Sequence, residues 1–387
     1  MRIFQILEFN QFNTGSVHQM FQAAAGLRER GHEVTIVSRP DAVLQSKSED
    51  AGVAFVDLSM RSEFDFGSAR KLSRLIRESK PDVIHVHKGV AHALALAATY
   101  TRPVGAFVVN RGVSFPLDFW NRPKFRTRRV DRIVTVCEQI RQVVIDSGKL
   151  PPQKVDVVYA GTDVNVFDPQ KWDRRAFRRE KNIPADAFLI AQVGVRDWKG
   201  WKELVDAFAG VHRGGRASHL ALIGCLNDAE SREVLDYARS RGVSEHVSAV
   251  EYRSDMPNVF ASCDLVVDSS WAGTGITGTI REAMSMGRPV IATDCGGNAE
   301  LVSSPDVGWL VRPKDVRALS TAIGEVISDP ARAARVGQAA RRRVVSGFSK
   351  EKRIEKLEAL YAEILSTKER RQPGGGPIAP RFFEGPR

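Results

Sequence analysis

The sequence predicts an α/β protein built from two doubly wound, Rossmann-like parallel sheets. The chain has 387 residues, more than one hydrophobic core usually accommodates, so two domains are expected. Short apolar runs alternate with segments of helical periodicity, which is typical of parallel sheets covered by helices on both sides. The alternation stops once near the middle and then starts again. We therefore expect two domains of this kind that face each other across a cleft.

The first round of alternation contains five apolar runs of strand length. These runs are Arg2–Glu8, Glu33–Ser38, Asp82–His87, Pro103–Asn110 and Arg132–Cys137. Between the first two, apolar residues recur on one helical face, and Gly31 can end that helix in the left-handed conformation. We assign residues 1–165 to an N-terminal Rossmann-like domain.

Residues 161–186 interrupt the alternation, because they are polar, charged and contain prolines. They predict a linker with a short helix. Strand-like runs then return at Phe188–Val195, His219–Gly224, Val247–Tyr252, Leu265–Ser270 and Pro289–Asp294. We assign residues 175–349 to a C-terminal Rossmann-like domain.

A last helix is predicted over residues 350–365. Its apolar positions share one face and are Ile354, Leu357, Leu360, Tyr361 and Ile364. The remaining segment, 366–387, is rich in Gly, Pro and Arg, and this composition predicts a disordered tail.

The composition narrows the class of protein. A net charge of +11 suggests an anionic partner, but no zinc-finger or aromatic RNA-binding signature indicates a nucleic-acid reader. The four cysteines stand far apart without a CxxC pair, which argues against a zinc site and fits a reducing cytoplasm. No apolar run approaches the ~20 residues that span a bilayer, and no signal peptide is recognised. We expect a cytoplasmic protein that can also lie on the inner face of the cell membrane.

The loop after the first strand, Asn10–Ser16, does not suit a nicotinamide dinucleotide. It lacks the GxGxxG pattern, and the second strand ends without an acidic residue. Gly15 stands beside a helix N-terminus, where backbone N–H groups can meet an anion. An ordinary tight turn explains this glycine equally well.

Two cations follow the first strand of the second domain. In Val193–Gly200, Arg196 and Lys199 bracket a short turn at the end of a strand, where ligands of open α/β sheets bind. A planar guanidinium and an ammonium are a suitable pair to hold a diphosphate. Two solvated loop cations are the alternative.

The segment Ser269–Glu282 carries a second candidate site. Small residues over Gly273–Gly278 precede a helix, so unpaired N–H groups lie beside the positive end of a helix dipole. Glu282, in the first turn or so of that helix, could accept two hydrogen bonds from a ribose diol, although a favourable helix-dipole charge is the simpler explanation. Gly296 and Gly297 predict a further tight loop at a strand end.

Several motifs in order resemble the family 4 glycosyltransferases of GT-B fold. They are DVIHVH, VDRIVTVCEQIRQVV, KVDVVYAGTDVNVFDP, VGVRDWKG, EAMSMGRPVIATDCGGNAELV and GWLVRPKDVRAL. The resemblance covers roughly residues 1 to 365. It implies an acceptor-binding first domain, a second domain that binds a nucleotide-diphosphate sugar, and a final helix that packs on the first domain. It also implies retention of the anomeric configuration, with no metal and no further cofactor; the leaving phosphate takes the acceptor's proton.

The resemblance also implies roles for individual residues. Arg196 and Lys199 would hold the donor diphosphate and stabilise its departure, and Glu282 would bind the ribose. The backbone of Thr277, Gly278, Thr279 and Ile280 would contact the sugar and the distal phosphate. Gly15 would let the first loop approach the diphosphate. His87 would reach the transferred sugar, whereas we expect His85 to be structural and to point to the opposite face of the strand.

The chain departs from the family pattern in three places. Thr274 stands where the family carries a glutamate near the donor sugar, eight positions before Glu282. Thr14 and Gly15 replace a Gly-Gly pair. After Asn110, Arg111-Gly112 replaces the usual His-Gly. We predict that Asn110 and Arg111 contact the acceptor. Arg111 could meet an anionic acceptor or the donor phosphates, and an ordinary surface loop arginine explains it equally well.

The acceptor is suggested by residues 115–132, where Phe115, Phe119, Trp120 and Phe125 are interleaved with basic side chains. Such a segment can lie on an anionic bilayer, which suits a hexosyltransferase that builds lipopolysaccharide, capsule or exopolysaccharide. A surface helix with a packed aromatic face is the alternative. Two other functions stay open: a sugar-nucleotide epimerase of the same fold, and a non-catalytic nucleotide-sugar-binding protein.

Overall fold

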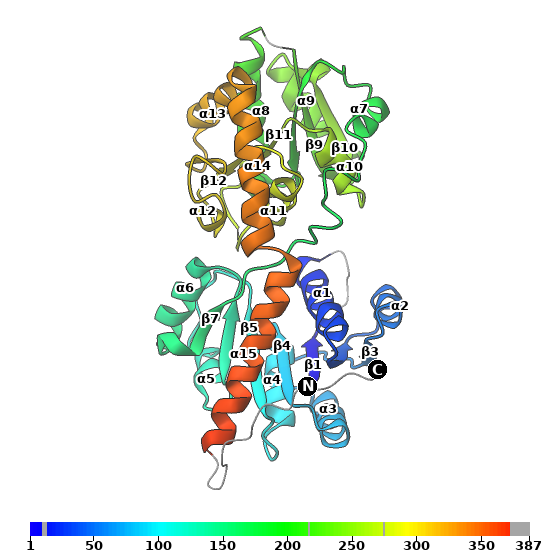
Figure 1. Ribbon diagram of the computed structural model, residues 1–387, viewed down its shortest axis with the longest axis vertical. Coiled ribbons are helices and arrows are strands. Elements are labelled where there is room, and N and C mark those ends of the chain that lie inside the picture. The colour runs from blue at the N-terminus through cyan, green and yellow to red at the C-terminus, as the bar shows by residue number, and fades with distance from the viewer. Residues whose placement is uncertain (10–13, 216, 274, 372–387) are drawn as a thin grey trace, which may run out of the picture. The chain divides into compact units, whose positions relative to one another are not determined.

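The computed structural model describes residues 1–9, 14–215, 217–273 and 275–371 (Figure 1). The chain forms two compact units. The first comprises Met1–Arg111, Phe119–Val134 and the chain from Ile354 onward, and the second comprises Gly112–Asp118 and Thr135–Arg353. Each unit is described by itself below.

The first sheet has seven strands in the order β3-β2-β1-β4-β5-β6-β7. Its strands are β1 (Arg2–Leu7), β2 (Glu33–Ser38), β3 (Ala54–Asp57), β4 (Val83–His87), β5 (Ala106–Arg111), β6 (Arg132–Thr135) and β7 (Val155–Val157). β1 pairs in parallel with both β2 and β4, so the strand order reverses between β1 and β4. β1 and β4 are buried on both faces, which explains why their residues are mainly apolar; the buried polar side chains among them are Gln5, His85 and His87.

Helices connect these strands. They are α1 (Gly15–Glu29), α2 (Ala42–Asp50), α3 (Phe66–Ser79), α4 (Gly89–Ala98), α5 (Arg122–Arg126) and α6 (Glu138–Gly148), followed by the 3₁₀ turn η1 (Pro152–Lys154). Asp41 caps α2 and Asp65 caps α3, because each carboxylate accepts a backbone N–H of the first turn.

The second sheet has six parallel strands in the order β10-β9-β8-β11-β12-β13. Its strands are β8 (Phe188–Val193), β9 (Ser218–Cys225), β10 (Val247–Glu251), β11 (Leu265–Asp268), β12 (Val290–Thr293) and β13 (Trp309–Val311). The order reverses between β8 and β11. Phe208, Leu220, Leu222 and Ile323 are fully buried members of the core of this unit.

Helices and 3₁₀ turns flank this second sheet (Figure 1). They are α7 (Ala176–Glu180), η2 (Asp197–Lys199), α8 (Trp201–His212), α9 (Asp228–Ser240), η3 (Ser244–His246), α10 (Met256–Ser262), α11 (Gly278–Ser285), α12 (Asn298–Leu301), α13 (Val316–Ser328) and α14 (Pro330–Gly347). α7 is the short helix expected within residues 161–186.

The last helix, α15 (Lys350–Arg371), packs on the first unit. The fully buried Tyr361 shares a 2.6 Å hydrogen bond with Nδ1 of His85, and its hydroxyl accepts a 3.4 Å hydrogen bond from Nε2 of Gln5. The prediction of disorder from residue 366 was wrong for residues 366–371, which continue the helix. There, Nζ of Lys368 lies 2.7 Å from Oδ2 of Asp131. The rest of the predicted tail lies outside the described residues.

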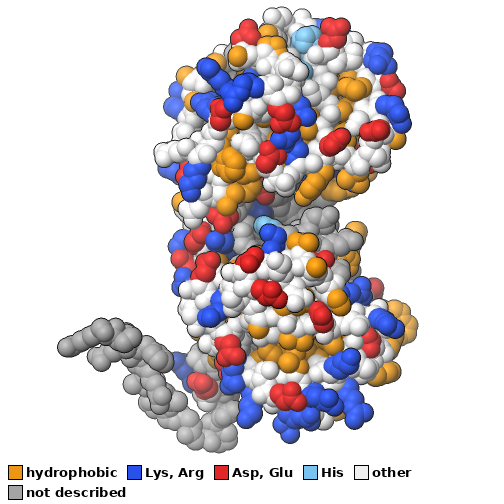
Figure 2. Space-filling view, turned by 90° about the vertical axis from the view of Figure 1, so that its right-hand side faces the viewer, with side chains coloured by type: hydrophobic (Ala, Val, Ile, Leu, Met, Phe, Trp, Pro, Cys, Tyr) orange, Lys and Arg blue, Asp and Glu red, His pale blue; other side chains and the backbone are white. Residues whose placement is uncertain are grey.

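The predicted fold class is confirmed: the protein consists of two Rossmann-like parallel sheets with a final helix on the first unit. Each of the ten predicted strands is present, with ends shifted by up to about three residues. None of the helices in the described part of the chain has the length and apolar character needed to cross a bilayer. Lys and Arg side chains are spread over the face in Figure 2, with Asp and Glu among them, so the positive charge is dispersed there.

Candidate active site

The candidate site lies at the carboxyl ends of β8 and β11 in the second unit. The strand order of the second sheet reverses between these two strands. Helices leave such a point toward opposite faces of the sheet, so a crevice opens outside the strand ends, and open α/β sheets bind ligands there.

Lys199 stands on the turn that follows β8. Its side chain is 15% exposed, and its Nζ lies 3.8 Å from Oδ1 of Asp268, the last residue of β11. The next residue, Gly200, has a φ of +67°, and a Cβ there would lie 2.1 Å from the carbonyl oxygen of Ser269. Glycine therefore lets the Lys199 turn lie directly against the chain that leaves β11.

A network of buried hydrogen bonds holds the backbone of the Lys199 turn in place. Nε2 of Gln192 donates to the Lys199 carbonyl at 3.0 Å, and Oε1 of Gln192 accepts the Ser269 hydroxyl at 2.6 Å. The Ser269 hydroxyl also lies 2.7 Å from the Gly200 carbonyl. Gln192 is fully buried, so its amide has no solvent alternative and orients the turn.

Asp268 joins the two parts of the site that the sequence suggested. It is 2% exposed, and it accepts hydrogen bonds from the hydroxyls of Thr277 and Ser270 while facing Lys199. Nδ2 of Asn298 lies 3.5 Å from the same carboxylate. Sequence reasoning missed Asp268 and Asn298; the available signal for Asp268 was a carboxylate at the end of an apolar strand run.

The N-terminus of α11 presents backbone donors. Thr277, its N-cap residue, makes no side-chain cap, because its hydroxyl bonds to Asp268 and its N–H donates to Oδ1 of Asn298 at 3.1 Å. The N–H groups of Gly278, Thr279 and Ile280 lie in the first turn, where a helix offers no internal acceptor. The Ile280 side chain is fully buried, so only its backbone can meet a ligand.

Glu282 is the fifth residue of α11, so it begins the second turn rather than lying in the first. Its carboxylate is half-buried and makes no hydrogen bond within the described chain. Burial raises the pKa of the Glu282 carboxyl above its usual range, and the neighbouring Arg281 cation opposes this rise. Arg281 is itself buried, and burial lowers its pKa to about 10. A half-buried acid without a partner is suited to accept a ligand's donors.

The other predicted donor-site residues are placed as follows. Nη1 of Arg196 forms a 2.7 Å ion pair with Oε1 of Glu230 on α9, so part of the positive charge of this guanidinium is already balanced within the protein. Gly296 has a φ of +61°, and a Cβ there would lie 2.6 Å from the Gly275 carbonyl, which is the tight loop expected. Thr274 lies outside the described residues.

The predicted residues of the first unit lie along the carboxyl edge of the first sheet. His87, the last residue of β4, is buried, and its Nε2 shares a 2.7 Å hydrogen bond with Oε1 of Gln5. Asn110 pairs with His87 across the β4–β5 ladder, and Arg111 ends β5. Gly15 begins α1, and no described atom lies within 4 Å of a Cβ built on it.

The expectation that His85 faces away from His87 was wrong. The two imidazole rings stack with centroids 4.5 Å apart. Side chains alternate along a strand, so positions two apart share a face, and only position 86 points the other way. His85 therefore links His87 to Tyr361 on α15, with which it shares a hydrogen bond.

The aromatic-basic segment 115–132 is not a surface helix with a packed aromatic face. α5 has five residues, and Phe125 is its buried aromatic side chain. Phe115, Phe119 and Trp120 are exposed, and Trp120 is 83% exposed.

With this geometry in place, comparison with known proteins identifies the family. The profile described as Glycosyltransferase Family 4 matches residues 14–166, and the one described as Glycosyl transferases group 1 matches residues 173–343. The chain belongs to the family 4 glycosyltransferases of GT-B fold, and it is a glycosyltransferase.

Individual relatives are distant but match over most of their length. The UDP-Gal:alpha-D-GlcNAc-diphosphoundecaprenol alpha-1,3-galactosyltransferase of Escherichia coli is 24% identical over 321 residues, which are 79% of this chain and 81% of the relative. The capsular polysaccharide biosynthesis glycosyltransferase CapM of Staphylococcus aureus is 24% identical over 361 residues, 89% of this chain and 93% of the relative.

Solved structures show the same fold. A glycosyltransferase from Rickettsia africae superposes with a TM-score of 0.87 at 20% identity, covering 94% of this chain and 98% of the other. HepE of Anabaena, solved in complex with UDP, superposes with a TM-score of 0.82 at 20% identity, covering 94% and 100%.

Proposed function

We propose that this protein is a retaining, metal-independent hexosyltransferase that moves a sugar from a nucleotide-diphosphate sugar to a glycan or lipid-linked acceptor. The observation that carries the proposal is the site on the second sheet. There, Lys199 and the N-terminus of α11 meet around Asp268, while Glu282 on the same helix has no hydrogen-bond partner in the described chain. A cation and free backbone N–H groups suit a diphosphate, and a carboxylate suits ribose hydroxyls.

The chemistry needs few protein groups. The acceptor hydroxyl oxygen forms a bond to the anomeric carbon on the face from which the diphosphate departs, and the bond to the phosphate oxygen breaks. The diphosphate leaves with the electron pair, and one of its oxygens takes the hydroxyl proton. The ammonium of Lys199 and the α11 N–H groups stabilise the charge on the departing diphosphate. In this proposal His87, with Asn110 and Arg111, acts on the sugar and acceptor from the first unit.

A uridine diphosphate sugar is the first donor to test, and a lipid-linked surface glycan is the acceptor we favour. HepE was solved with UDP and with UDP-glucose, and the Escherichia coli relative is named for a UDP-galactose donor and a diphosphoundecaprenol acceptor. Exposed Phe119 and Trp120 precede the exposed Arg126 and Arg128, and such a segment favours an anionic bilayer surface. The proposed location is therefore the inner face of the membrane, and the product is a lipopolysaccharide, capsule or exopolysaccharide.

The test is product analysis with labelled nucleotide sugars and lipid-linked acceptors in the presence of EDTA. We expect transfer that EDTA does not lower, with the anomeric configuration of the donor kept in the product, as read by NMR. Activity lost in EDTA and restored by magnesium or manganese would contradict metal independence. Epimerised donor without transfer, or binding without turnover, would replace the proposal with one of the two other functions named above.

Glu282 gives this proposal a pH signature. Ribose hydroxyls donate to the ionised carboxylate, so binding of UDP should weaken as the acid becomes protonated. Because the pKa of Glu282 is raised, protonation begins at a higher pH than for an ordinary glutamate, and the loss of affinity appears in weakly acidic solution. Calorimetric titration of UDP from about pH 8 to about pH 5 measures it. The Glu282→Gln variant should bind UDP more weakly at neutral pH, and its affinity should change with pH only through ionisation of the nucleotide's own phosphate. If the affinity for UDP depends on pH in the same way in both proteins, Glu282 is not part of the site.

A further inference from the structure

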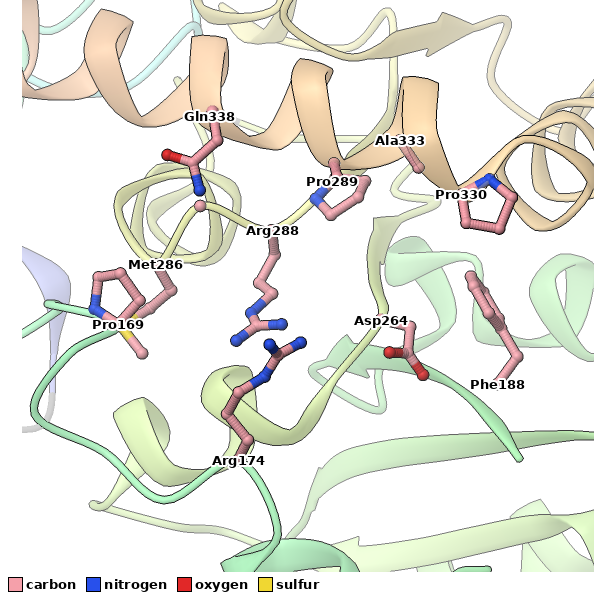
Figure 3. A pocket seen from close by; sticks show the side chains of 12 residues that line it. Pro169, Arg174, Phe188, Asp264, Met286, Arg288, Pro289, Pro330, Ala333 and Gln338 are labelled. Carbon is pink, nitrogen blue, oxygen red and sulfur yellow. The ribbon is translucent and has the colours of Figure 1, made fainter. Parts of the chain in front are cut away.

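A second pocket lies at the opposite edge of the second sheet, at the amino-terminal ends of its strands. Phe188 at the start of β8, Asp264 just before β11 and Pro289 just before β12 all line it (Figure 3). Its volume is about 390 Å³, within the range of small-molecule sites. It shares no residue with the candidate active site.

Two arginine side chains converge in this pocket. Figure 3 shows the guanidinium groups of Arg174 and Arg288 pointing toward each other across it. Arg288 is 7% exposed, and its Nη1 donates to the Cys263 carbonyl at 3.1 Å. Nε of Arg288 is buried and has no hydrogen-bond partner within the described chain. Arg174 is exposed and makes no ion pair there.

Within the described residues, neither arginine of this pair forms an ion pair with a carboxylate. Burial, and then the positive charge of Arg174, lower the pKa of Arg288, while the charge of the Asp264 carboxylate opposes this shift. The nearby carboxylate of Asp264 is already used: its Oδ2 accepts from Nη2 of Arg178 at 2.6 Å and from the Leu189 N–H at 2.8 Å. The Cys263 thiol is no counter-ion either, because burial raises its pKa to about 12. A buried donor and two unbalanced cations are a combination that an anion would relieve.

We propose that this pocket binds the phosphoryl group of a small organic phosphate between Arg174 and Arg288. Guanidinium groups offer several donors in a plane, and a tetrahedral phosphoryl group has enough oxygens to accept from two such planes at once. The remaining lining is largely apolar, with Pro169, Met286 and Phe188 on its walls (Figure 3), and this lining suits the organic part of the ligand. The pocket also contacts the turn that ends α11, the helix whose other end belongs to the candidate active site.

Calorimetric titration of the full chain with inorganic phosphate and with glucose 6-phosphate tests this site. We expect saturable binding of both, tighter for glucose 6-phosphate, and no binding of glucose. Arg174→Ala should weaken both at least ~10-fold, because it removes a charge-assisted contact without breaking an internal one. The matched control is Arg175→Ala, which removes the adjacent exposed arginine outside the pocket and should change affinity less than ~2-fold.

A Lys199→Ala variant separates this site from the active site. Phosphate binding that survives Lys199→Ala and is lost in Arg174→Ala supports the pocket, whether or not the protein transfers sugar. Binding lost in Lys199→Ala and kept in Arg174→Ala would overturn the proposal, as would equal weakening by Arg174→Ala and Arg175→Ala. Equal affinity for inorganic phosphate and glucose 6-phosphate would contradict the proposal that the pocket also binds the organic part of the ligand.

Discussion

Replacing Lys199 with alanine is expected to lower kcat by about 10²- to 10³-fold, the usual cost of removing one preorganised group that stabilises developing charge. The side chain is held for this task, because the Gln192–Ser269 network fixes its backbone and Asp268 lies 3.8 Å from its Nζ. Most of that stabilisation arises as the diphosphate leaves, so we expect kcat to fall more than KM rises. Steady-state kinetics with a UDP-sugar measure both.

Two variants calibrate this result. Lys202→Ala removes a nearby lysine whose exposed ion pair with Glu233 lies on the outer surface, so its kinetics should match the unchanged protein. Arg196→Ala should cost less than Lys199→Ala, since its guanidinium is already bound to Glu230 at 2.7 Å. Equal kcat in Lys199→Ala and Lys202→Ala would show that Lys199 is an ordinary loop cation.

Gly200→Ala is expected to destabilise the second unit by about 3 kcal/mol or more. Two costs add: a φ of +67° is unfavourable for alanine, and its Cβ would meet the Ser269 carbonyl at 2.1 Å. The obstacle is backbone, so it cannot rotate away. Differential scanning calorimetry should show a lower unfolding temperature, and activity should fall with it, because relief of the clash moves Lys199.

Gly242→Ala separates the two costs. Gly242 has a φ of +75°, but no described heavy atom lies within 4 Å of a Cβ built there, so only the conformational cost of about 1–2 kcal/mol applies. If both variants lose the same stability, the Lys199 turn does not depend on its contact with Ser269.

Most of the strands predicted from the sequence are largely buried, and β10 is the edge strand among those of the second sheet. β1, β4, β8 and β11 are rich in apolar residues because helices cover both sides of the sheet, although buried polar side chains interrupt the first three. The three missed strands, β3, β7 and β13, have three or four residues, and each lies at the edge of its sheet. Their apolar stretches are too short to be recognised as strands from the sequence alone.

The site was predictable only in part, for a related reason. The sequence indicates Arg196, Lys199 and Gly278, because each is a charged or small residue beside a strand end or a helix start. Gln192 gives no such signal, and Asp268 gives only that of a carboxylate at a strand end. The contacts of both residues depend on which strands are neighbours. The hydrogen bond from Ser269 to Gln192 joins residues 77 positions apart, and it exists because β11 lies beside β8. Strand order follows from the packing of the whole sheet, which local patterns do not encode.

The first unit is assembled from both ends of the chain. Lys350–Arg353 count with the second unit, yet α15 continues into the first, where Ile354, Leu357, Leu360, Tyr361 and Ile364 are buried. A fragment that stops at the end of the first sheet would keep every strand of that sheet, but it would expose the apolar surface that these side chains cover. The buried polar groups of Gln5 and His85 would also lose their hydrogen bonds to Tyr361. A premature stop codon before α15 would therefore destabilise the first unit, although most of that unit is translated first. For the same reason, we expect the N-terminal half to fold poorly when it is expressed on its own.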